Sequence, residues 1–134
     1  TYTWDIIPLL VDTAMFVLIW CVQLVVYPAF AFMSGDSLNC WHRLYTPRIA
    51  LLTAPLMCIQ LLWYSLMSIR ACSLQNAIAL ILVIAMWILT FRYFVPLHNR
   101  IQNDTHTEPD LGRLVRWNWW RTMGWTVVWG LHWW

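Results

Sequence analysis

Hydrophobic positions follow one another in four long runs, and the polar positions fall mainly between these runs. No formal charge occurs in the 21 residues between Arg48 and Arg70, nor in the 21 residues between Arg70 and Arg92. A hydrocarbon core of about 30 Å takes about 20 residues of α-helix, so each stretch is long enough to cross a bilayer. The pattern predicts four membrane-spanning helices, at about residues 6–33, 49–69, 77–94 and 117–134.

The segments between these runs are short, and they predict an up-down bundle of four transmembrane helices. Residues 34–39 are rich in turn formers. Pro28 is expected to kink or end the first helix, and Pro47 is expected to begin the second. Residues 101–112 form the most hydrophilic connection, in which Thr107, followed by an early proline and two acidic residues, predicts the N-cap of a helix.

The composition supports a membrane protein. Hydrophobic residues make up 61% of the chain and charged residues 10%, whereas soluble domains have about 25% charged residues. The runs are continuous and about twice the length of a barrel strand, which argues against a transmembrane β-barrel. We expect residues 1–134 to form one all-α integral membrane domain. Its first helix is expected to be a retained span, because neither a basic segment nor a cleavage site marks it as a signal peptide.

All eight basic residues are arginines, and their placement predicts the orientation of the bundle. Seven of them flank the first and third connections, and only Arg70 lies at the second. The positive-inside rule then places the first and third connections in the cytoplasm and both termini outside. We expect the protein in a bacterial inner membrane or another energy-transducing membrane. The net charge of +2 follows from this topology and gives no support for nucleic-acid binding.

Asp12 is the most costly residue to place in the membrane, at about 2.5–3.5 kcal/mol for a carboxylate well inside a span. On the predicted topology it lies at a depth similar to that of His132 in the fourth helix. The two residues form either a proton or ligand site, or a structural arrangement, which is a hydrogen bond between helices or a carboxylate reached by interfacial water. The structural role is the commoner one for such a pair.

Polar and basic side chains are also expected to gather at the cytoplasmic ends of the helices. They are His42, Arg43, Arg48, Arg92, His98, Asn99, Arg100, Asn118 and Arg121. Arginine forks suit phosphate or carboxylate groups, although contact with lipid phosphates explains most of these arginines. Asn118 and Arg121 are the best candidates for a binding site, because they lie three residues apart on one helical face near the apolar boundary.

Seven of the 12 tryptophans lie in residues 117–134. Trp125, Trp129 and Trp133 repeat every four residues and therefore share one helical face. The first two lie too deep for interfacial anchoring alone, so the stripe predicts contact with a partner protein, a pigment ring or lipid tails. The four histidines lack the spacing of a metal site, and the sequence requires no cofactor. A single histidine in a span can also ligate a haem iron or a pigment, a role that would fall to His132.

Short motifs carry a family resemblance. They are Val26-Tyr27-Pro28-Ala29, Leu44-Tyr45-Thr46-Pro47-Arg48, Ala54-Pro55-Leu56, Val95-Pro96-Leu97-His98-Asn99-Arg100-Ile101 and Asn118-Trp119-Trp120-Arg121-Thr122. In these motifs the chain resembles the anthrone oxygenase-like family of small four-helix membrane proteins, over nearly its whole length. The resemblance implies the four-helix fold and a shared polar cluster of Asn99, Arg100, Asn118 and Arg121. Named members oxidise polycyclic anthrones without an obvious cofactor; His98 and the Trp-rich end of the fourth helix depart from the family pattern.

Two function classes follow from these observations. In the first, the chain is a non-catalytic accessory subunit that packs against a larger membrane complex of respiratory or photosynthetic type, through the tryptophan face and the apolar third helix. In the second, it is a small cofactor-independent membrane oxygenase that encloses a hydrophobic aromatic substrate near Asn118 and Arg121. The sequence favours the first class, because spacing alone brings no acid–base pair within hydrogen-bonding reach.

Overall fold

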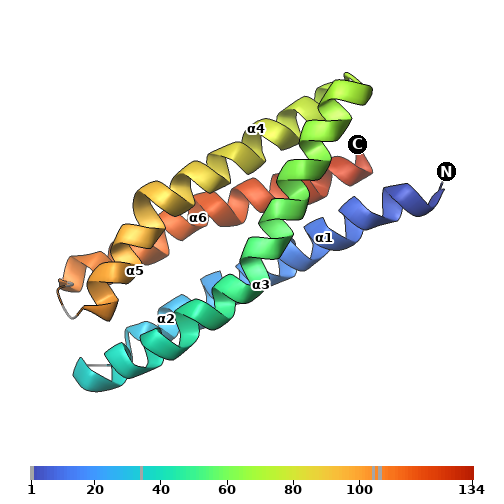
Figure 1. Cartoon of the computed structure of the whole chain (residues 1–134). Coiled ribbons are helices and arrows are strands. Elements are labelled where there is room, and N and C mark those ends of the chain that lie inside the picture. Colours follow the sequence, from blue (N-terminus) through green and yellow to red (C-terminus); the bar gives the residue numbers. More distant parts are fainter. Residues whose placement is uncertain (1, 34, 104, 106) are drawn as a thin grey trace.

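The computed structural model describes residues 2–33, 35–103, 105 and 107–134, and all regular elements within these ranges are helical. This confirms the prediction of an all-α chain. Four helical rods run side by side and alternate in direction (Figure 1).

The rods have the following bounds. The first consists of α1 (Tyr2–Cys21), a π-helical segment (Val22–Val26) and α2 (Tyr27–Phe30). The second is the single helix α3 (Gly35–Arg70). The third consists of α4 (Leu74–Leu89), a second π-helical segment (Thr90–Phe94) and α5 (Val95–Gln102). The fourth is α6 (Glu108–Gly130), which ends in a 3₁₀ turn (Leu131–Trp133).

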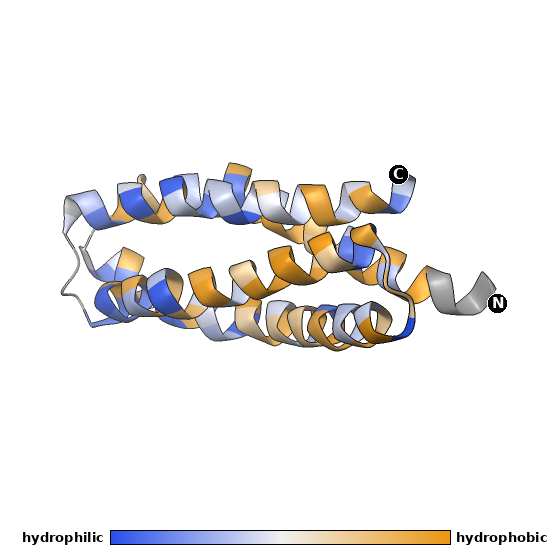
Figure 2. Cartoon of the chain, turned by 90° about the horizontal axis from the view of Figure 1, so that it is seen from above, coloured by the Kyte–Doolittle hydropathy of each residue, from blue (hydrophilic) through white to orange (hydrophobic). Residues whose placement is uncertain are grey.

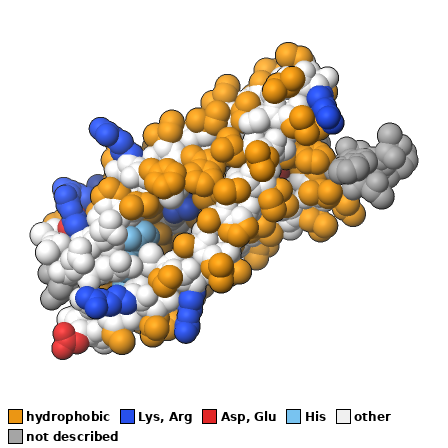
Figure 3. Space-filling view, viewed as in Figure 1, with side chains coloured by type: hydrophobic (Ala, Val, Ile, Leu, Met, Phe, Trp, Pro, Cys, Tyr) orange, Lys and Arg blue, Asp and Glu red, His pale blue; other side chains and the backbone are white. Residues whose placement is uncertain are grey.

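The two ends of the bundle differ in their charge. Both chain termini lie at the same end as the connection between α3 and α4, which we call the terminal end (Figure 1). The other two connections lie at the opposite end, which we call the arginine end, because seven of the eight arginines belong to the segments that meet there. Figure 3 shows most of the basic side chains of one face gathered toward the arginine end, with apolar side chains covering the middle.

The second helix is longer than the sequence predicts. α3 begins at Gly35 rather than near residue 49, and the loop expected before Pro47 is helical. Pro47 and Pro55 both lie inside this helix of 36 residues. Each proline removes one backbone hydrogen bond, but the buried side chains of Leu38 and His42 hold the first turns of α3 against the other rods. The predicted start at Pro47 was therefore wrong.

Two other prolines follow the π-helical segments. Pro28 comes two residues after the first segment, and Pro96 two residues after the second. A proline ring clashes with the carbonyl four residues before it, which here belongs to Leu24 or to Arg92, inside the π segment in each case. A π turn is wider than an α turn and makes room for the ring. Pro28 therefore does not end the first rod, which continues to Phe30.

The start of α6 confirms the N-cap predicted at Thr107. The backbone N–H of Thr107 donates to the Asp110 carboxylate at 2.9 Å, as in a capping box. This backbone hydrogen bond holds the pKa of the Asp110 carboxyl below its usual range, and the positive charges of Arg100 and Arg113 lower it further. The two guanidinium groups lie 3.6 and 3.5 Å from the carboxylate.

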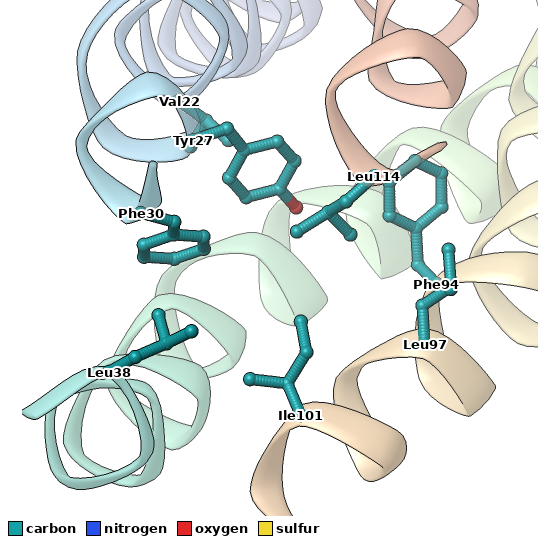
Figure 4. Close-up of a cluster of buried hydrophobic side chains, with 8 residues drawn as sticks. All are labelled: Val22, Tyr27, Phe30, Leu38, Phe94, Leu97, Ile101 and Leu114. Atoms are coloured by element: carbon teal, nitrogen blue, oxygen red, sulfur yellow. The ribbon is translucent and has the colours of Figure 1, made fainter. Parts of the chain in front are cut away.

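The core runs along the whole bundle in three clusters. At the arginine end, side chains from all four rods meet (Figure 4); they are Val22, Tyr27, Phe30, Leu38, Phe94, Leu97, Ile101 and Leu114. The middle cluster contains Met57, Met86 and Trp125. There Gly124 lets α6 approach α4 closely, because a Cβ atom at this position would lie 2.7 Å from Cε of Met86. A third cluster, around Tyr64 and Val83, lies nearer the terminal end.

Three helical stretches are long and apolar enough to cross a membrane: Ile6–Phe30, Gly35–Arg70 and Leu74–Gln102. The fourth rod, α6, is not among them. Figure 2 shows α6 as the more hydrophilic rod leading to the C-terminus, beside rods with longer hydrophobic stretches.

Candidate functional site

A partly open cavity of about 140 Å³ lies between the rods, and both π segments contribute to its wall. Val22 comes from the first segment, and Thr90 and Phe94 come from the second. The polar side chains at the wall are those of Tyr27, Tyr45, Thr46, Thr53, Thr90, His98 and Arg121; the rest of the wall is apolar. An engineered apolar cavity of about 150 Å³ holds one benzene molecule, so this cavity has room for about one aromatic ring. π turns inside α-helices are frequent at functional sites.

Arg121 of α6 brings a positive charge to this wall, although its side chain is only 7% exposed. The guanidinium lies over the ring of Phe94 at 4.4 Å and over the ring of Trp125 at 5.0 Å. It also lies near the Tyr27 hydroxyl. Among the described residues no carboxylate pairs with Arg121, and its Nε has no hydrogen-bond partner. A buried charge without a counter-ion is costly, and this arrangement suits a ligand that brings an anionic or carbonyl oxygen.

Two histidines from distant parts of the chain meet beside Arg121. Nε2 of His42, in α3, lies 2.7 Å from Nδ1 of His98, in α5. Nε2 of His98 lies 3.4 Å from the Tyr27 hydroxyl, and Nδ1 of His42 lies 3.2 Å from Oγ1 of Thr46. A neutral imidazole has one donor and one acceptor nitrogen, so this chain of four groups can be hydrogen-bonded in either direction. Such a chain can transfer a proton.

A neighbouring network fixes the rotation of α6. Asn118 donates through Nδ2 to Oε1 of Gln23 at 2.8 Å, and Gln23 lies in the first π segment. The Thr122 hydroxyl donates to the backbone carbonyl of Asn118 at 2.9 Å and lies 3.5 Å from the same Gln23 oxygen. Since Arg121 lies between Asn118 and Thr122 in the sequence, these contacts keep its guanidinium turned toward the cavity.

A second polar cluster lies nearer the terminal end, around Asp12. Oδ1 of Asp12 accepts a hydrogen bond from Nε2 of Gln60 at 2.7 Å. Oδ2 accepts one from the Tyr64 hydroxyl and lies 2.6 Å from Nε2 of His132. The indole N–H of Trp125 donates to Oε1 of Gln60 at 3.1 Å. The structure thus brings the predicted pair, Asp12 and His132, together, and it joins α1, α3 and the fourth rod through one carboxylate with a full set of donors.

The polar cluster implied by the resemblance does not form from all four residues. Asn99 and Arg100 are exposed on α5, because the buried face of this helix carries Leu97 and Ile101. Arg100 pairs with Asp110 instead. Asn118 and Arg121 are both buried, but Asn118 binds Gln23 whereas Arg121 faces the cavity.

The tryptophan stripe does not form one contact surface. Trp125 is buried within the chain, so it is not available to a partner or a pigment. Trp129 is half-buried; its indole donates to Oγ1 of Thr13 at 3.0 Å, and its ring stacks on Phe16 at 4.7 Å. Trp133 is 71% exposed. Residues four apart turn by about 40° per step around a helix of 3.6 residues per turn, so the stripe drifts from the core to the surface.

Sequence reasoning missed the partners of these groups. His42 and His98 were expected only as members of a larger basic cluster, and Tyr64 was not singled out. A polar side chain inside an apolar run is the signal available from the sequence, but it does not say which of the other rods supplies the partner. Within the described part of the chain, no three or more His, Cys, Asp or Glu side chains lie close enough to hold a metal ion.

Comparison with known proteins yields no match to a family model, to a curated protein or to a solved structure. The resemblance to the anthrone oxygenase-like family therefore stays a prediction from short motifs. Function has to be argued from the site itself.

Proposed function

We propose that all four rods cross the membrane, with α6 as the fourth span. Its polar residues Asn118, Arg121 and Thr122 are buried in the bundle. From residue 117 to the end of the chain, every side chain on the outside is apolar or aromatic: Trp119, Trp120, Met123, Val127, Trp133 and Trp134. A helix whose polar groups point inward and whose apolar groups point outward suits a lipid environment, even though its mean hydropathy is low.

The proposed orientation places the arginine end in the cytoplasm and both termini outside. Cys40 lies near the arginine end and Cys72 at the terminal end, and both thiols are exposed. In sealed membranes we expect an impermeant maleimide to label Cys40 only from the cytoplasmic side and Cys72 only from the other side. Labelling of both thiols from the same side would contradict the four-span arrangement. The expected location is a bacterial inner membrane or another energy-transducing membrane.

For the activity, we propose a small membrane enzyme that binds a hydrophobic aromatic substrate through a carbonyl or phenolate oxygen and removes a proton from it. One observation carries this proposal: a buried guanidinium that pairs with no carboxylate among the described residues and a hydrogen-bonded imidazole border the same, mostly apolar cavity. The sequence favoured an accessory subunit because it showed no acid–base pair. The pair of His42 and His98 now supplies one.

The roles of the side chains follow from their positions. Arg121 and the Tyr27 hydroxyl bind the substrate oxygen and stabilise the negative charge that develops on it. His98 accepts the proton from the carbon or hydroxyl next to that oxygen. A carbanion stabilised in this way reacts with molecular oxygen, which is the co-reactant that the family resemblance implies. Met15, at the cavity wall, is a flexible side chain that yields to a substrate larger than one ring.

Oxygen uptake by the purified protein tests this activity, with anthrone as the probe. We expect uptake above the spontaneous rate, and a fall of about a hundredfold in Arg121→Met, since an oxyanion-stabilising group contributes about that factor. Arg113→Met is the matched control, because Arg113 is exposed at the arginine end and should keep the wild-type rate. Uptake by the wild type that is no faster than the spontaneous reaction would refute the proposal.

An accessory subunit is the second candidate function, and the outward tryptophans of α6 favour it. Trp120 lies with Trp117 and Met123 beside an almost wholly apolar surface groove between α4 and α6. Aromatic anchors of this kind often dominate the energy of an interface. If a partner membrane protein sits here, purification in mild detergent should recover it in a fixed ratio, and Trp120→Leu should release it. A protein that purifies alone in both forms would remove this candidate.

A further inference from the structure

His42 has no evident task in acid–base chemistry at the cavity. His98 alone of the pair reaches the cavity wall, whereas His42 lies fully buried behind it. A general base needs only the first of these rings. Nε2 of the second ring lies 2.7 Å from Nδ1 of His98, and its Nδ1 lies 3.2 Å from Oγ1 of Thr46.

Thr46 stands between the cavity and the surface. It contributes to the wall of the cavity, and it also lines a surface hollow at the arginine end, together with Arg43, Pro47, Gln102 and Asn103. This hollow is open, with a volume of about 590 Å³. The guanidinium of Arg43 spans it by donating to the backbone carbonyl of Gln102 at 3.1 Å, which joins α3 to the end of α5. Water in the hollow is therefore one side chain away from His42.

We propose that His42 and Thr46 form a proton relay between His98 and water at the arginine end. The inference rests on the proposed function, because only a site that removes a proton supplies one to the relay. As the substrate C–H bond breaks, an N–H bond forms at Nε2 of His98, and Nδ1 of His98 passes its proton to Nε2 of His42. Nδ1 of His42 then passes its proton to the Thr46 hydroxyl, which gives one to water.

The relay is balanced at each group, since each accepts one proton and releases one. Transfer outward leaves both imidazoles in the opposite tautomer. Transfer of one proton inward, when the reduced oxygen is protonated, restores both. Each direction thus starts from the tautomers that the other direction leaves, and the observed distances between the groups suit both.

Proton release without oxygen separates a relay from a purely structural pair. Under argon, absorbance reports formation of the anthrone anion, and a pH indicator reports the proton released to water. With the relay broken, the proton stays on His98, so anion formation continues while proton release falls. We expect Thr46→Val and His42→Gln to lower the rate of proton release about tenfold relative to anion formation.

Thr53→Val is the matched comparison for Thr46→Val. Thr53 is another threonine of α3 at the cavity wall, but its hydroxyl donates to the backbone carbonyl of Ile49 at 3.0 Å and not to the relay. Even if Thr53→Val changes both rates, their ratio should stay at the wild-type value. Equal loss of both rates in the Thr46 and His42 variants would overturn the relay and leave a structural role.

A second measurement needs no substrate. It therefore tests the relay even if anthrone is not deprotonated, a result that would contradict the proposed function. In protein labelled with ¹⁵N-histidine, NMR measures the exchange of the His98 ring proton with water. We expect this exchange to slow about tenfold in Thr46→Val and to keep its wild-type rate in Thr53→Val. An unchanged rate in Thr46→Val would overturn the relay.

Discussion

The two buried polar regions of this bundle differ in how completely their charged groups are hydrogen-bonded. The Asp12 carboxylate is 1% exposed and has donors for both oxygens, from Gln60, Tyr64 and His132. The Arg121 guanidinium is almost as deeply buried, but it lies near aromatic rings and one hydroxyl, and its Nε has no hydrogen-bond partner among the described residues. A buried group with all its hydrogen bonds made contributes to stability, whereas one left incomplete costs free energy. The comparison indicates a structural role for the first region and a binding role for the second.

Trp125 tests the separation of the two regions, because it touches both. Its indole donates to Gln60 at 3.1 Å, and its ring lies beneath the Arg121 guanidinium. We expect Trp125→Leu to lower the free energy of unfolding by about 3 kcal/mol, through loss of buried contacts and of one hydrogen bond. Reversible unfolding in mixed micelles measures it. Trp133→Leu, at an exposed position, should change this free energy by less than about 0.5 kcal/mol; equal effects would remove the distinction between core and surface tryptophans.

Substitution of Asp12 sharpens the structural side of the comparison. Asp12→Leu leaves three donors without their acceptor, and hydrogen bonds between membrane helices are worth about 0.6 kcal/mol each, so we expect a loss of about 2 kcal/mol in the same unfolding assay. Asp36→Leu removes an exposed carboxylate and should cost at most about 1 kcal/mol. If Asp12→Leu unfolds with the same free energy as the wild type, the cluster is not structural. A role as a proton or ligand site would then be favoured.

Arg121 should behave in the opposite way. Arg121→Met removes a charge that pairs with no carboxylate in the described part of the chain, and it keeps an unbranched apolar side chain. We therefore expect the free energy of unfolding to change by no more than about 1 kcal/mol in either direction. The same variant should lose activity, as described above. A loss of stability as large as that of Asp12→Leu would place both regions in the same structural class.

Asp110 offers a smaller effect than Asp12, because its carboxylate caps the first turn of α6 rather than joining three rods. Its pKa is lowered in the folded protein, first by the backbone N–H of Thr107. The cap is therefore fully stabilising above the usual carboxyl pKa of about 3.9, and this stabilisation is lost as the pH falls through the lowered value. Asp110→Asn should cost about 1 kcal/mol at neutral pH. At pH 6, hydrogen exchange at residues 110–113 should then be faster in Asp110→Asn than in the wild type. Equal exchange rates in the two proteins would show that the cap does not stabilise the start of α6.

The sequence predicted the helical class, the N-cap at Thr107 and the depth match of Asp12 with His132. The predicted start of α3 was wrong. The turn-forming residues and Pro47 favour a loop locally, but in the folded chain the burial of Leu38 and His42 stabilises a helix from Gly35. The sequence failed for the cluster of Asn99 and Arg100 because no local pattern showed that Leu97 and Ile101 occupy the inner face of α5.

The sequence by itself determined that the chain is helical and suited to a membrane, since long uncharged apolar runs of about 20 residues have few other stable environments. Only the tertiary structure decided which polar groups meet. Asp12 and His132 are 120 positions apart, and His42 and His98 are 56 apart. Their contacts depend on how each rod is rotated about its own axis, and the two π segments set that rotation where the cavity lies. A helical pattern specifies which residues share a face, but packing of the four rods specifies which faces meet.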